Sequence, residues 1–328
     1  MAESYFLLQL RSAVGDVRLA LKEVSKAALP SPVWRGLKRV AGRQARAVRD
    51  LDEIDRLIRL ADEAYAKSEE DGLRCVQSFR FEWPTPLPRD PYSKEYRDAQ
   101  LGLYRHLAGR DGYSVEHEYS GIDVNAALES PYPYSTRSTR IAGEYFIALG
   151  FLLKNLPLAD GARVIEFGAG WGHTTDALSA LGFDVTAVEV DPGFAELLRR
   201  KLANRRGARV IQSDMLSVEL EKPVDAALFF ESFHHCADHL AMFEKLRRLV
   251  RPRGWLVLAG EPVGDFEMPW GVRLDGQSLY AMRKHGWLEL GFETGYLINT
   301  LKRFGWLPWR IRTSLAPAAD VIVARLAA

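Results

Sequence analysis

Three glycines at alternate positions follow a short apolar run near the middle of the chain. Residues 164–167 are typical of a buried strand, and Gly168, Gly170 and Gly172 come directly after it. Because glycine has no side chain, a ligand can approach the backbone closely at such a turn. A helix that begins here presents unpaired N–H groups and a positive dipole end. The turn therefore predicts a site for a ligand with polar or anionic groups, at the carboxyl end of a strand.

Acidic residues lie at the ends of the next two predicted strands. Glu189 ends the second strand, 21 residues after Gly168, and Asp214 with Met215 follows the third. An acidic side chain about 20 residues after the glycine turn can accept hydrogen bonds from both ribose hydroxyls. The dinucleotide fingerprint would require a glycine at position 173, where the chain has His173. The ligand is thus expected to carry a nucleoside, and the NAD pattern is incomplete.

The spacing of Glu166 and the three glycines resembles motif I of the class I S-adenosylmethionine (SAM) methyltransferases, (D/E)-x-G-x-G-x-G. This resemblance implies that SAM is the cofactor, that Glu189 holds its ribose, and that Asp214 and Met215 contact its adenine. It also implies that Glu166 lies at the methionine end. The implied cofactor-binding residues are Glu166, Gly168, Ala169, Gly170, Gly172, Glu189, Val190, Asp214, Met215 and Glu231. An NAD-dependent oxidoreductase and a catalytically inactive SAM-binding subunit remain as alternatives.

Two adjacent histidines follow the fourth predicted strand, where the family places groups near the transferred methyl. Histidine titrates near neutral pH, so it can remove the proton of an attacking hydroxyl. We predict His235, and after it His234, as the general base; a structural role for either is the alternative. With Cys236 and His239 these residues could suggest a metal, but adjacent residues do not easily share one ion, and no metal is predicted.

The chemistry of the acceptor is less well defined by the sequence. Residues 231–234 read Glu-Ser-Phe-His, which departs from the Asn-Pro-Pro-Tyr-type motif of many amino-methylating relatives. This departure favours O-methylation of a small-molecule or glycan hydroxyl. Four residues in two segments outside the core motifs are candidates for contacting the acceptor, with a surface loop or packing as the alternative. They are Tyr134, Arg137, Trp270 and His285.

From residue 161 onward, apolar runs alternate with helical patterns, which is the signature of a parallel sheet with helices on both faces. We predict an α/β fold with a doubly wound, mostly parallel seven-stranded sheet and a terminal antiparallel hairpin. Asp191 and Pro192 are predicted to begin a helix that Gly207 closes. The predicted strands cover residues 164–167, 185–190, 209–213, 226–230, 255–259, 309–313 and 321–324, and a turn over 251–254 precedes the fifth.

The N-terminal part of the chain has a different pattern. Residues 1–140 are predicted as a helical accessory region, and residues 141–328 as the methyltransferase domain, with 262–290 as an acceptor-side insertion. An apolar seam over residues 1–30 indicates a helix that either packs on its own domain or forms a homo-oligomer contact. Residues 51–65 have the spacing of an amphipathic helix.

Composition limits the class of protein. With 328 residues, 47% of them hydrophobic and 27% charged, the chain is expected to be globular. A net charge of +1 gives no nucleic-acid signature. The basic residues between 35 and 49 are interpreted as a solvated helix face, with contact to anionic lipid, polysaccharide or nucleic acid as the alternative. Two distant cysteines, Cys75 and Cys236, fit a reducing cytoplasm. The N-terminus has no signal-peptide pattern, and no uncharged apolar run reaches the ~18 residues that a membrane span needs.

Overall fold

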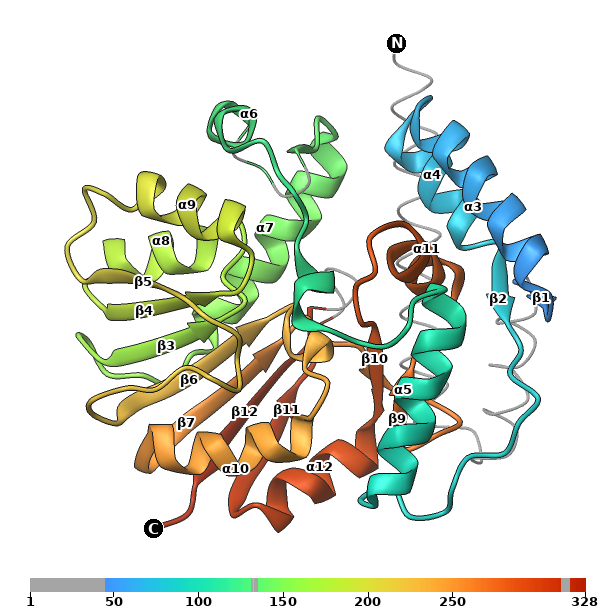
Figure 1. The fold of residues 1–328 in the computed structure, drawn as a ribbon. Helices are drawn as coiled ribbons and strands as arrows, with labels where there is room; N and C mark the ends of the chain where they lie inside the picture. Colours follow the sequence, from blue (N-terminus) through green and yellow to red (C-terminus); the bar gives the residue numbers. More distant parts are fainter. Residues whose placement is uncertain (1–44, 131, 133–134, 314–318) are drawn as a thin grey trace, which may run out of the picture.

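The computed structural model describes residues 45–130, 132, 135–313 and 319–328. The predicted helix over residues 1–30, with its proposed oligomer contact, and the candidate Tyr134 lie outside the described residues. A seven-stranded sheet with the order β11-β12-β7-β6-β3-β4-β5 dominates the described part (Figure 1). Its strands are β3 (Arg163–Phe167), β4 (Asp184–Glu189), β5 (Ala208–Gln212), β6 (Val224–Phe230), β7 (Val250–Ala259), β11 (Trp306–Ile311) and β12 (Val321–Leu326).

The pairing of these strands confirms the predicted fold class. The strands from β5 to β7 are parallel, while β12 is antiparallel to both β7 and β11. Strands covered on both faces need apolar residues at successive positions, and four of the five residues of β3 are buried. Val164 belongs to the core cluster on one face, and Ile165 belongs to the cluster on the other.

Helices cover both faces of the sheet. On one face, α7 (Thr139–Lys154) and α8 (His173–Ala180) bury Leu149, Leu152 and Leu178 against the strands. On the other face lie α10 (His239–Leu249) and α12 (Thr294–Arg303). The helix α9 (Pro192–Lys201) begins as predicted, because Asp191 caps it through the N–H groups of Gly193 and Phe194.

The N-terminal elements pack on the insertion rather than directly on the large sheet (Figure 1). They are β1 (Arg46–Val48), α3 (Leu51–Tyr65), α4 (Glu69–Val76), β2 (Phe79–Phe81) and α5 (Lys94–Ala108). The chain from residue 263 to 293 forms β8 (Val263–Gly264), β9 (Trp270–Val272), α11 (Gly276–Lys284) and β10 (Leu290–Glu293), and its three strands pair in the order β8-β10-β9.

Specific polar contacts join these two parts. The Tyr96 hydroxyl donates to the Trp270 carbonyl at 2.8 Å, and the Tyr104 hydroxyl donates to the Gly286 carbonyl. The Arg283 Nε donates to the Asp55 Oδ1 at 2.7 Å, and the same guanidinium also donates through Nη2. A single buried apolar cluster extends from the N-terminal elements and the insertion to one face of the large sheet. The accessory elements and the insertion therefore share a core.

A connecting segment leads from α5 across to the large sheet. It contains the 3-10 helix η2 (Val115–Glu118) and the short helix α6 (Val124–Glu129), which contacts α9. Ser114 and His117 form a capping box around η2. The backbone N–H of Ser120 donates to the Asp191 carboxylate, which ties the segment to the start of α9.

Three predicted boundaries were wrong. Helix α9 ends at Lys201, with Leu202 as its C-cap, and Gly207 instead takes up φ +81° immediately before β5, where a Cβ would lie 2.9 Å from the Phe183 carbonyl. Strand β7 already begins at Val250, because the predicted turn is an irregularity within the strand, with a shifted register and a positive φ at Arg253. The first strand of the terminal hairpin begins at residue 306 rather than 309.

Among the described residues, every helix is too short or too polar to cross a lipid bilayer.

Candidate active site

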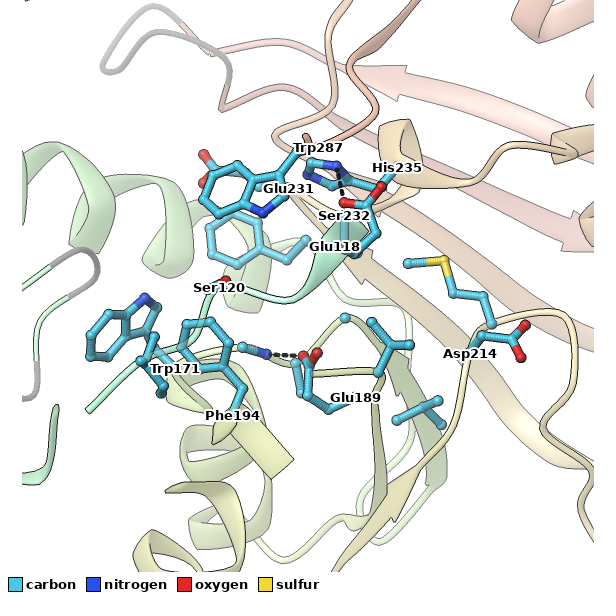
Figure 2. Close-up of a pocket in the computed structure, with 18 of the residues that line it drawn as sticks. Glu118, Ser120, Trp171, Glu189, Phe194, Asp214, Glu231, Ser232, His235 and Trp287 are labelled. Carbon is cyan, nitrogen blue, oxygen red and sulfur yellow. Dashed lines mark hydrogen bonds and ion pairs between the residues drawn. The ribbon is translucent and has the colours of Figure 1, made fainter. Parts of the chain in front are cut away.

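A cavity of about 600 Å³ opens at the carboxyl ends of β3, β4, β5 and β6 (Figure 2). Its walls come from the glycine turn, the ends of these strands, the segment around η2 and α6, and the end of the insertion. Eleven of the predicted site residues line it: Glu166, Gly168, Ala169, Gly170, Glu189, Val190, Asp214, Met215, Glu231, His235 and His285. The structure thus brings together residues that are up to 119 positions apart in sequence (166 to 285).

The glycine turn needs glycine for steric reasons. Gly168, Gly170 and Gly172 have φ values of +66°, +46° and +74°, a region that L side chains rarely adopt. A Cβ on Gly168 would lie 2.6 Å from the Ser232 Cβ, and one on Gly172 would lie 2.4 Å from a Leu198 methyl. Gly172 is the N-cap of α8 and does not itself line the cavity. Its role is to let the turn pack closely against α9.

Glu189 is held by the backbone around it. Its Oε2 accepts the Gly170 N–H at 2.8 Å, and its Oε1 accepts the Asp191 N–H at 3.0 Å (Figure 2). The residue is buried, which raises the pKa of its carboxyl, while these amide hydrogen bonds act in the opposite direction. The carboxylate therefore joins the end of β4 to the glycine turn of β3, at the floor of the cavity.

Asp214 and Met215 form the wall beyond β5. The Asp214 Oδ1 accepts the N–H groups of Leu216 (2.8 Å) and Ser217 (3.0 Å), which fixes the carboxylate at the cavity edge. The Met215 methyl lies next to the glycine turn. On the opposite side, burial raises the pKa of Glu166 to about 7, and its carboxyl accepts a hydrogen bond from the Thr175 hydroxyl.

The loop after β6 is fixed by a single buried carboxylate, that of Glu261. Glu261 accepts the N–H groups of Ser232, Phe233 and His234 at 2.9, 2.8 and 3.1 Å. It also contacts the Nδ1 atom of His234 at 2.7 Å. His234 is buried and does not line the cavity. The structure therefore places this second candidate base in the loop scaffold.

Glu231 precedes this loop and has an unusual backbone conformation. Its φ of +53° is unusual for a non-glycine residue and turns the chain sharply at the end of β6. Its side chain lines the cavity, and burial followed by the charge of Glu261 raises its pKa to about 7.

His235 faces the cavity and pairs with a residue that the sequence did not suggest. Its Nδ1 lies 3.2 Å from the Glu118 Oε2 (Figure 2). Burial lowers the pKa of His235, but the charges of Glu118, Glu289 and Glu261 outweigh it and raise the pKa to about 9. Glu118 lies in η2, 117 positions earlier in the chain (235 − 118). No local pattern could have linked two positions so far apart.

Three side chains near this loop could together hold a metal ion. A ligand atom from each of His234, His235 and Glu289 lies within 4.8 Å of the others. Glu289 is buried in the insertion and was not predicted, and the sequence prediction of no metal stays a prediction.

The four predicted acceptor contacts have different positions. His285 lines the cavity and stacks on Trp287, another lining residue, with ring centroids 4.5 Å apart. Trp270 is 2% exposed and outside the cavity lining, with its indole N–H donating to the Pro91 carbonyl at 2.8 Å. Its size and apolar surface make it a core residue between α5 and β10. Arg137 is exposed and also lies outside the lining.

Comparison with known proteins agrees with this geometry. The family model described as a methyltransferase domain matches residues 165–258. A ubiquinone biosynthesis O-methyltransferase of Xylella fastidiosa (strain 9a5c) is 31% identical over 235 residues, which covers 64% of this chain and 92% of that protein. The chain belongs to the class I SAM-dependent methyltransferases. It is therefore a methyltransferase enzyme with SAM as its cofactor, and the NAD-dependent alternative is set aside.

A second sequence relative aligns with this chain over a shorter stretch, and solved structures also match it. A ubiquinone biosynthesis O-methyltransferase of Xanthomonas oryzae pv. oryzae (strain PXO99A) is 29% identical over 116 residues, 34% of this chain and 48% of that protein. Among solved structures, a Burkholderia thailandensis 1,6-didemethyltoxoflavin-N1-methyltransferase with bound S-adenosylhomocysteine is 22% identical. That alignment covers 66% of this chain and 92% of the other, with a TM-score of 0.45.

Proposed function

We propose that this methyltransferase transfers the SAM methyl group to a hydroxyl of a small molecule or glycan, with His235 as general base. The observation that carries the proposal is the position of His235, in the same cavity as the glycine turn and Glu189. The names of the O-methyltransferase relatives support oxygen as the attacking atom. Of the described residues that line the cavity, none is lysine or arginine, so an uncharged hydroxyl acceptor suits it better than a phosphorylated one.

The residues that line the cavity allow each part of SAM to be assigned to a position. We assign the ribose hydroxyls to Glu189, the adenine to Asp214 and Met215, and the methionine end to Glu166 and Glu231. Gly168 and Gly170 bring bare backbone to the same surface, and Ala169 adds only a methyl group. When bound, SAM supplies a methyl group that is already activated, so the chain has to align the acceptor and take its proton.

His235 can take that proton through Nε2 when its ring is neutral, and with a pKa of about 9 the neutral fraction, and with it the rate, should increase as the pH rises towards that value. His235 lines the same cavity as the glycine turn, and Nε2 is its ring nitrogen that does not face Glu118. The acceptor oxygen would bond to the methyl carbon as the methyl–sulfur bond breaks, with S-adenosylhomocysteine as the leaving product. His235 Nε2 would receive the hydroxyl proton, and the ring would become an imidazolium. We further propose that the accessory region (1–140) and the insertion (262–290) form the acceptor wall, since Tyr113, His285 and Trp287 line the cavity.

The proposal is tested by incubating the protein with methyl-labelled SAM and a panel of glycans and small hydroxyl compounds. We expect one class of hydroxyl to gain label. His235→Asn should lower kcat about 10²- to 10⁴-fold, the range for loss of a general base, while the affinity for S-adenosylhomocysteine is retained. Label on nitrogen or carbon, or full turnover by His235→Asn, would refute the proposal. A parallel reaction with a chelator shows whether turnover requires a metal ion bound by His234, His235 and Glu289.

A further inference from the structure

The acidic partner of His235 comes from outside the matched methyltransferase region. Glu118 lies in η2, in the segment that leads from α5 to the sheet, whereas the family model matches residues 165–258. The Glu118 side chain is 11% exposed, and that of His235 is 22% exposed. Their contact at 3.2 Å is therefore largely shielded from water, which makes the electrostatic attraction stronger than at a surface.

The position of the Glu118 carboxylate is determined by more than one contact. While Oε2 faces His235, Oε1 accepts the backbone N–H of Leu288 in the insertion at 3.1 Å. The same carboxylate thus bridges η2, the insertion and the loop after β6. A glutamate that served only to end η2 would need neither contact.

Hydrogen bonds hold η2 and the residues next to it against α5, the insertion and the loop after β6. The His117 Nδ1 lies 3.2 Å from the Tyr104 hydroxyl of α5, and that hydroxyl donates to the Gly286 carbonyl of the insertion. On the other side, the Tyr113 hydroxyl donates to the His235 carbonyl at 3.4 Å. This set of contacts places Glu118 opposite the His235 ring, so the segment is part of the site's geometry.

We propose that Glu118 is a positioning residue for methyl transfer: it orients the His235 ring and favours the Nδ1 proton, so that Nε2 is the basic nitrogen. This inference rests on the proposed role of His235 as base. The other charged groups around the ring are Glu289 in the insertion and Glu261 after β7, and the His234 ring lies 4.2 Å away, centroid to centroid. Of the three carboxylates, Glu118 is the one whose oxygen lies 3.2 Å from a ring nitrogen of His235.

The test uses the full chain with S-adenosylhomocysteine and does not need an acceptor. The titration of the His235 ring is followed by NMR, with the signal assigned by its loss in His235→Asn. We expect a midpoint near 9 in the unchanged protein. In Glu118→Gln the midpoint should fall by at least about one pH unit, a tenfold change in proton affinity. Glu116→Gln is the matched control, because Glu116 lies in the same 3-10 helix, is exposed, and pairs with Ser114.

An unchanged midpoint in a folded Glu118→Gln protein would overturn the inference. Should that variant not fold, Glu118→Asp keeps the charge but withdraws it by one methylene, and it should lower the midpoint by a smaller amount. An unchanged midpoint in Glu118→Asp would equally count against positioning. Once an acceptor is known, Glu118→Gln should move the rising, acidic limb of the kcat profile to lower pH and lower the plateau value of kcat, with little change in KM. If no hydroxyl is labelled while the midpoint still responds to Glu118, the proposed function fails but the pairing stands.

Discussion

At the scale of single residues, the site is built on carboxylates that the fold has removed from water. Glu166, Glu189 and Glu261 are all buried, and each accepts hydrogen bonds from neighbouring hydroxyl or amide groups. A buried carboxylate without partners would be protonated or would destabilise the fold. Two of them therefore have a structural role, Glu189 at the glycine turn and Glu261 at the loop after β6, before any ligand is considered.

The first prediction concerns Glu189. Replacing it with alanine should weaken binding of S-adenosylhomocysteine about 10- to 100-fold, because hydrogen bonds to a charged group contribute about 1.5–3 kcal/mol. Calorimetric titration of the purified variant measures this. Glu196→Ala in α9 is the control, since that side chain is 42% exposed and pairs with surface arginines. Equal affinities for both variants would remove Glu189 from the cofactor site.

The second prediction is a pH dependence that arises from His239. This residue is 1% exposed, and its Nε2 lies 2.8 Å from the Tyr296 hydroxyl. Burial lowers the pKa of His239 to about 3, and the charge of Arg97 adds to the effect. In the unfolded chain the pKa returns to about 6.5, so the unfolded state binds more protons between these values. The contribution to stability is complete above about pH 6.5 and is lost as the pH falls towards about 3.

Urea unfolding at several pH values measures this slope. Its limit for one group is about 1.4 kcal/mol per pH unit. His239→Gln keeps a polar group near Tyr296 but does not titrate, so the loss of stability between about pH 6 and 4 should be smaller than in the unchanged protein. His106→Gln, at an exposed position, is the control. A slope that does not change in His239→Gln would show that other groups cause the acid sensitivity.

At the scale of elements, glycine is required in the turn between β3 and α8, but it is not required in the middle of α7. Gly168 has a positive φ and no space for a Cβ, whereas a Cβ added to Gly150 in α7 would have nothing within 4 Å. Gly168→Ala should lower the free energy of unfolding by about 1–2 kcal/mol or more and abolish measurable cofactor binding. Gly150→Ala should raise stability by about 0.5–1 kcal/mol. Thermal unfolding and calorimetry check both, and a stable, SAM-binding Gly168→Ala protein would contradict the steric requirement.

Elements with a regular pattern could be predicted from the sequence, and those set by distant contacts could not. The periodicity of residues 51–65 predicted α3, and Asp191 with Pro192 predicted the start of α9. The beginning of β7 was missed because its bulge is dictated by pairing with β6, which the local sequence does not show. Glu118 was missed for the same reason: its importance depends on His235 and Leu288, which only the folded chain brings near.

At the scale of the whole molecule, Trp270 connects the accessory region to the rest. It packs on Tyr96 of α5 and on His239 of α10, with ring centroids 5.3 and 4.6 Å away. Trp270→Ala should lower the free energy of unfolding by about 3–5 kcal/mol, the range for truncating a buried aromatic residue. Because the core is continuous, both parts should lose stability in one transition. Trp309→Ala, at a position that is 51% exposed, should cost less than about 1 kcal/mol.

Fluorescence and circular dichroism recorded during urea unfolding distinguish these outcomes. Two separate transitions in the Trp270→Ala protein would show that the accessory region and the sheet are independent units, and would support a sharp boundary near residue 140. A calorimetric titration of the Trp270→Ala protein below the unfolding transition tests whether Trp270 acts only through packing, because the affinity for S-adenosylhomocysteine should then be retained.

The order of strands in the large sheet also bears on how the protein is made. β12 lies between β7 and β11, yet it is the last of the seven to be synthesised. Until residues 321–326 have left the ribosome, β7 has an open edge and β11 has no neighbour to pair with. The nascent chain therefore cannot complete its sheet before this last strand emerges, and until then the edge of β7 is open to pairing with another chain.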